Sequence, residues 1–134
     1  MSQERVERVL DLYRLFNEGK FDQALADLPD EIEWVVLDVL PDQGPYDGRE
    51  GVRRFWMAWL ETFEEFRIDV LDRHDLDDHV VVIMRVGGTG RDSGLDVDSP
   101  PFTAVWTWRD DELARMEMFP DENTARAAIG KDWR

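Results

Sequence analysis

The hydrophobic period of the chain changes once, near residue 66, and this change constrains the fold more than any other feature. Before it, apolar residues recur at helical intervals, as Val9, Tyr13 and Phe16 do. After it, apolar and polar residues alternate, which is typical of strands with one buried face. Helices followed by strands predict an α+β domain in which the helices cover one face of a curved antiparallel sheet.

The helical half predicts three helices and one strand. The first helix ends at Gly19, and the second has Asp22 as its N-cap and stops at Pro29. A strand over residues 31–40 precedes a third helix, whose aromatic residues Phe55, Trp59 and Phe63 we expect to be buried against the sheet.

The strand half predicts four strands, over residues 66–71, 80–86, 94–109 and 112–119, with acidic or glycine turns between them. Pro100 and Pro101 cannot donate to a ladder, so they predict a break in the long third strand. A short last helix is expected between Asp121, as its N-cap, and Gly130. We find no repeat or linker, and residues 1–134 are therefore interpreted as a single domain.

Charge and composition exclude several kinds of partner. Thirty-one acidic residues against sixteen basic ones give a formal charge of −15, which disfavours nucleic acid and anionic membranes. The chain has no cysteine, and no apolar run is long enough to span a bilayer. With no signal-peptide pattern at the N-terminus, a cytoplasmic location is expected. His74 and His79 flank an acidic turn, which we interpret as a solvated turn; no metal site and no cofactor are expected.

Two stretches carry a resemblance to a known family. LYRLFNEGKFDQALADLPDEIEW and GPYDGREGVRRFWMAWLETF resemble the N-terminal half of SnoaL-like members of the nuclear transport factor 2-like superfamily. VWTWRDDELARMEMFPD and TARAAIG are similar to the C-terminal half. The resemblance implies a cone-shaped fold with an apolar pocket, and homodimers. It implies no single activity, because the superfamily includes ketosteroid isomerases, polyketide cyclases and epoxide hydrolases.

The catalytic residues of these enzymes are incompletely matched. Where the resemblance would place the isomerase tyrosine, base and neutral acid, this chain has Leu12, Val36 and Ala104. Asp121 matches the aspartate that polyketide cyclases have after their last strand, but no histidine lies on the preceding strand. Asp121 is therefore a candidate catalytic acid, with helix capping as the alternative. Arg85 is the one available part of an epoxide hydrolase set.

The aromatic residues have two interpretations, core packing and the lining of a ligand pocket. Strand parity places Ala104 and Trp106 on one face, and Met116 and Met118 on one face of the next strand. We expect a pocket for a small, largely apolar ligand, of polycyclic or terpenoid-like shape, with these lining residues: Leu12, Phe16, Trp34, Trp56, Trp59, Ala104, Trp106, Met116 and Met118. The alternative is an acid–base enzyme of cyclase, isomerase or epoxide hydrolase type that uses Asp121.

Other polar residues near this pocket also have two interpretations. Arg49, in the loop with Tyr46, is interpreted as part of a turn-stabilising ion pair or as a binder of an anionic group at the mouth. A homodimer is expected through the outward sheet face, with Val105, Thr107 and Arg115 among the contacts.

Overall fold

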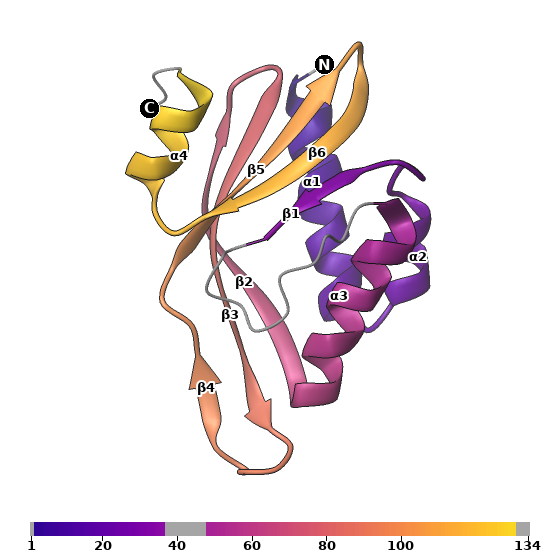
Figure 1. Ribbon diagram of the computed structural model, residues 1–134, viewed down its shortest axis with the longest axis vertical. Coiled ribbons are helices and arrows are strands. Elements are labelled where there is room, and N and C mark those ends of the chain that lie inside the picture. The colour runs from indigo at the N-terminus through magenta and orange to yellow at the C-terminus, as the bar shows by residue number, and fades with distance from the viewer. Residues whose placement is uncertain (1, 37–47, 131–134) are drawn as a thin grey trace.

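A computed structural model describes residues 2–36 and 48–130 of the chain. Three helices come early, six strands form one sheet, and a fourth helix follows the last strand (Figure 1). In chain order the elements are α1 (Ser2–Asn17), α2 (Phe21–Ala26), β1 (Glu33–Val35), α3 (Gly48–Thr62), β2 (Phe63–Asp75), β3 (His79–Gly90), β4 (Asp96–Asp98), β5 (Phe102–Arg109), β6 (Glu112–Phe119) and α4 (Glu122–Ile129). The expected α+β class, with its helical first half, is confirmed.

The sheet has the strand order β1-β6-β5-β3-β2, with β4 pairing to β3 beside β5. All pairs are antiparallel except β1 and β6, which run parallel. The predicted break at the two prolines is confirmed, because residues 99–101 separate β4 from β5. β2 is longer than the predicted 66–71, and residues 37–40 of the predicted first strand lie outside the described part of the chain.

The two faces of the sheet are covered by different helices. α1, α2 and α3 lie on the concave face, and α4 lies on the other, convex face (Figure 1). Alternate residues of the same strands divide between them: Val80 and Val82 belong to the concave core, and Val81 and Ile83 to a smaller cluster under α4. The prediction that Val105 contacts a partner subunit is wrong, because Val105 is only 3% exposed in the cluster under α4.

The curvature of the sheet depends on irregular pairing between β2 and β3. The register shifts between Glu64 and Arg67, and Glu65 adopts a positive φ of 53°. Gly88 lies under this bulge, where a Cβ would come within 3.0 Å of the Phe63 Cβ and 3.2 Å of the Phe66 Cα. A side chain at this position would require the opposing backbone to shift by a few tenths of an ångström, so glycine suits this close approach. The bulge bends the sheet and brings Phe66 to the concave face.

The end of α1 is joined to the edge of the sheet. Gly19, with a φ of 77°, ends the helix as expected, and the Lys20 N–H donates to the Leu15 carbonyl at 2.9 Å. The Asn17 side chain donates through Nδ2 to the Ile68 carbonyl, and Oδ1 accepts from the Ile68 N–H, both at 2.8 Å. These two bonds fix the position of α1 over β2.

The helix caps were predicted with mixed success. α4 begins after Asp121 and ends at Gly130, with a φ of 73°, as expected. The expected N-cap of α2, Asp22, is wrong: the N-cap is Lys20, two residues earlier, and it makes no side-chain capping bond. None of the helices in residues 2–36 and 48–130 is both long and apolar enough to cross a membrane.

Candidate functional site

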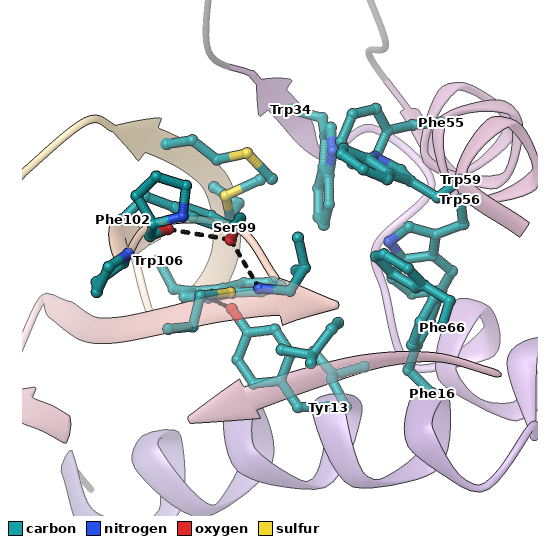
Figure 2. A pocket seen from close by; sticks show the side chains of 18 of the residues that line it. Tyr13, Phe16, Trp34, Phe55, Trp56, Trp59, Phe66, Ser99, Phe102 and Trp106 are labelled. Carbon is teal, nitrogen blue, oxygen red and sulfur yellow. Dashed lines mark hydrogen bonds between the residues drawn. The ribbon is translucent and has the colours of Figure 1, made fainter. Parts of the chain in front are cut away.

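A cavity of about 360 Å³ lies between the concave face of the sheet and α1 and α3. Figure 2 shows aromatic side chains from helices and strands pointing toward one another around it. The lining consists almost wholly of apolar and aromatic side chains: Leu12, Tyr13, Phe16, Trp34, Phe55, Trp56, Trp59, Phe66, Ile68, Met84, Val86, Ser99, Pro100, Pro101, Phe102, Trp106, Met116, Met118 and Pro120.

Eight of the nine residues expected to line a pocket lie in this wall, and the ninth, Ala104, does not. Ala104 has the expected strand parity and is fully buried, between its cross-strand neighbours Val82 and Met118. Its methyl group is too short to reach past these larger neighbours. Parity predicted the correct face of β5, but side-chain length decides which residues on that face reach the cavity.

Eleven of the nineteen lining residues were not among those predicted from the sequence. Phe66 was assigned to a strand, and the bulge that turns it inward has no clear sequence signal. Pro100 and Pro101 were interpreted only as a strand break, yet they also line the cavity. The sequence signal that could have identified these two prolines as lining residues is the uninterrupted apolar run from Pro100 to Phe102.

The rings of the wall meet in two arrangements. In the interior they contact edge to face: Trp34 contacts Trp106 with centroids 5.6 Å apart, and Phe16 contacts Trp56 at 5.0 Å. Toward the half-buried side, Trp59 and Phe66 stack at 5.3 Å with an interplanar angle of 25°. Trp59 and Phe63, both expected to be buried, are half-buried, and Phe63 continues this stack. Rigid rings in fixed contacts give the cavity a defined shape.

One polar pair is buried in this apolar wall. The Trp106 indole Nε1–H donates to the Tyr13 hydroxyl oxygen at 2.9 Å (Figure 2). Tyr13 is 8% exposed and Trp106 1%. Burial raises the pKa of Tyr13 well above its ordinary value, because the phenolate is poorly solvated there; the indole hydrogen bond opposes this more weakly. Tyr13 therefore remains a neutral phenol at physiological pH.

Ser99 supplies a second hydroxyl, but its hydrogen bonds are used within the protein. Its Oγ accepts from the Val86 N–H and donates to the Pro100 carbonyl, both at 3.0 Å (Figure 2). Its backbone N–H also donates to the Val86 carbonyl at 2.8 Å. At the break between β4 and β5, Ser99 thus makes the hydrogen bonds to the Val86 backbone that a paired strand residue would make.

Asp121 is outside the cavity wall and caps α4. Its Oδ1 accepts from the Thr124 N–H and from the Thr124 hydroxyl, both at 2.8 Å. These hydrogen bonds, the backbone one first, lower the pKa of Asp121 below its ordinary value. Of its two interpretations, this geometry favours the helix cap.

The remaining candidate residues are dispersed. Arg49 donates to the Leu28 carbonyl at 2.6 Å and pairs with Asp30 at 2.8 Å, which favours the turn-stabilising interpretation. The His79 Nδ1 lies 3.0 Å from the Thr107 hydroxyl, across the β3–β5 pair. Tyr46 lies outside the described residues.

Comparison with known proteins agrees with this geometry. The family model for the SnoaL-like domain matches residues 9–116. Solved structures with the same fold include a nuclear transport factor 2-like protein from Burkholderia thailandensis, at 24% identity and a TM-score of 0.72, covering 92% of this chain and 95% of that one. Two others are Bal32a, from a soil-derived mobile gene cassette (18%, TM-score 0.76, covering 88% and 89%), and TerC, co-crystallised with polyporic acid (22%, TM-score 0.73, covering 94% and 98%).

No curated protein matches the sequence. The family match extends over most of the chain, from α1 into β6, and includes most of the elements that build the cavity. The chain belongs to the SnoaL-like domain family and has the nuclear transport factor 2-like fold.

Proposed function

We propose that this protein binds a small, flat, largely apolar molecule, polycyclic or terpenoid-like, in the cavity under the concave face. The observation that carries the proposal is the wall itself, in which rigid rings from α1, β1, α3, β2 and β5 surround about 360 Å³. A cavity of this volume with an almost wholly apolar lining is typical of small-molecule sites.

Burial of apolar ligand surface can supply enough free energy for binding without any charged contact. Burying one aromatic ring of a ligand contributes about 2 kcal/mol, so a molecule with several fused rings reaches roughly micromolar affinity. The co-crystallisation of the similar protein TerC with polyporic acid supports small-molecule binding within this fold.

Binding is favoured over acid–base catalysis by the chemistry of the wall. Among the described lining residues, polar side-chain atoms come from Tyr13, Ser99 and the tryptophan indoles. None of these groups exchanges a proton near neutral pH. Asp121, the acid of the alternative enzyme, is held by Thr124 at the start of α4.

Tryptophan fluorescence tests the proposal, because Trp34, Trp56, Trp59 and Trp106 all line the cavity. Titration with a panel of polycyclic aromatic and terpenoid compounds should give saturable changes at roughly micromolar concentrations. Met118→Trp, which places an indole in the wall, should abolish the response. Leu71→Trp is the matched control, because Leu71 is 46% exposed and outside the wall. An unresponsive wild-type protein, or an unchanged response in Met118→Trp, would contradict the proposal.

We also propose that two copies associate through the part of the convex face that α4 leaves open. This area carries Arg115, which pairs with Glu33 at 3.1 Å and with Glu117 at 2.8 Å. Because this area carries both acidic and basic side chains, a two-fold axis can bring the arginine of one copy against a glutamate of the other. Light scattering at roughly tens of micromolar protein, where weak dimers form, should give the dimer mass. A monomer mass would contradict this proposal.

A further inference from the structure

The hydroxyl proton of Tyr13 lacks an acceptor in the described part of the chain. The oxygen accepts from the Trp106 indole at 2.9 Å, which is its one hydrogen bond there. A phenol is both a donor and an acceptor, so one half of its hydrogen-bonding capacity is unused. A buried donor without a partner is costly, and such groups in a native protein require an explanation.

The geometry directs the unused proton away from the indole. In a phenol, the O–H bond lies in the plane of the ring, and an in-plane lone pair lies on the other side of the C–O bond. The Trp106 indole occupies an acceptor position on the Tyr13 oxygen, and both residues belong to the cavity wall. Figure 2 shows the Tyr13 oxygen directed toward Trp106 and the strands, rather than back along α1. The indole thus fixes the hydroxyl orientation and leaves the proton available.

We infer that Tyr13 donates a hydrogen bond to an oxygen atom of the bound molecule, so that the preferred ligand is a flat apolar compound with one carbonyl or similar acceptor. This inference rests on the proposed function, and it adds the chemical class of the ligand. The Trp106 indole strengthens the donor, because hydrogen bonds in a chain polarise one another. Ser99 is not a competing donor, since its proton is bound by the Pro100 carbonyl.

A matched pair of probes tests the inference. Fluorenone and fluorene have nearly the same shape, but only fluorenone carries a carbonyl oxygen. Wild-type protein should bind fluorenone about fivefold more tightly, as expected for one net hydrogen bond. In Tyr13→Phe the ratio of the two affinities should fall to about one, because only fluorenone loses a hydrogen bond when the hydroxyl is removed.

The outcomes separate this inference from the proposal on which it rests. If the wild-type protein binds fluorene and fluorenone equally, or if Tyr13→Phe keeps the preference, the inference is overturned and the apolar pocket stands. If neither compound, nor any other flat apolar probe, binds, the proposed function fails and the inference fails with it.

Infrared spectroscopy gives a readout that does not depend on affinity. The carbonyl band of fluorenone bound to wild-type protein should lie at lower wavenumber than in hexane, and Tyr13→Phe should reverse this shift. If Tyr13→Phe does not fold, a ring-fluorinated tyrosine introduced only at position 13, which is a stronger donor, should lower the band further. If the carbonyl band shifts neither in Tyr13→Phe nor with the fluorinated tyrosine at position 13, the inference is overturned.

Discussion

Val105 and Trp106 are neighbours on β5 and are both almost completely buried, yet they serve different faces of the sheet. Trp106 faces the cavity and contacts Tyr13 and Trp34 edge to face. Val105 packs with Val81 and Ile83 beneath the short helix α4. The convex cluster consists mostly of small and branched side chains, with Phe119 as its one ring among the described residues, whereas many wide rigid rings on the concave side leave a space between them. The type of side chain, more than the degree of burial, determines which face contains a cavity.

The contrast between the two faces is tested most directly by truncating Trp106, the largest fully buried side chain of the concave core. Trp106→Ala should lower the free energy of unfolding by about 3–5 kcal/mol, because a large buried side chain is lost. It also removes the hydrogen bond to Tyr13. Urea denaturation followed by circular dichroism measures the loss. A cost below that of a valine truncation on the convex face would mean that the ring is poorly packed.

The convex face is tested by a smaller truncation that should leave the pocket intact. Val81 is fully buried, and Val81→Ala should cost about 2 kcal/mol, from two lost methyl groups and the void they leave. Ligand titration should give the same affinity as the wild-type protein, because Val81 faces α4. A change in affinity as large as that in Trp106→Ala would show that the two faces are coupled.

The smallest expected effect concerns the cap of the helix on the convex face. Asp121→Ala should cost less than either core truncation at pH 7, because only the two exposed hydrogen bonds from Thr124 are lost. The pKa of Asp121 is lowered in the folded state, so the stabilisation is present above the ordinary aspartate pKa of about 3.9 and is lost as the pH falls through the folded value. The stability difference between wild type and Asp121→Ala should therefore be present at pH 7 and should decrease as the pH falls below about 3.9.

Ligand affinity in the same variant distinguishes the two interpretations of Asp121. As a helix cap, it leaves affinity for flat apolar probes unchanged when replaced by alanine. A loss of affinity with unchanged stability would instead assign Asp121 to the ligand site.

The sequence was sufficient to predict the faces of the sheet but not its curvature. Period and parity correctly placed Leu12, Trp34 and Trp106 in one wall, because alternation follows directly from strand geometry. The bulge that turns Phe66 inward depends on the close approach over Gly88, which involves two strands. The cluster under α4 was also missed, because Ala125 and Ile129 gave a helix without indicating which face it covers.

The hydrogen bond between Tyr13 and Trp106 could also not be predicted from the sequence. The two residues are 93 positions apart, and no local pattern connects them. Tyr13 was placed on the apolar face of the first helix, but its hydroxyl could be assigned a partner only once β5 was folded against that helix.

Asn17 has a consequence for how copies of this protein can meet. β2 is an outer strand of the sheet, and outer strands have peptide groups that can pair with a strand from another molecule. At Ile68 both of these groups are already bound by the Asn17 amide, which has the donor and acceptor of a peptide but does not continue as a strand. An incoming strand would have to displace this amide and the end of α1 with it. The end of α1 therefore prevents another strand from pairing with β2 at Ile68, and edge-to-edge association of copies through this part of β2 is blocked.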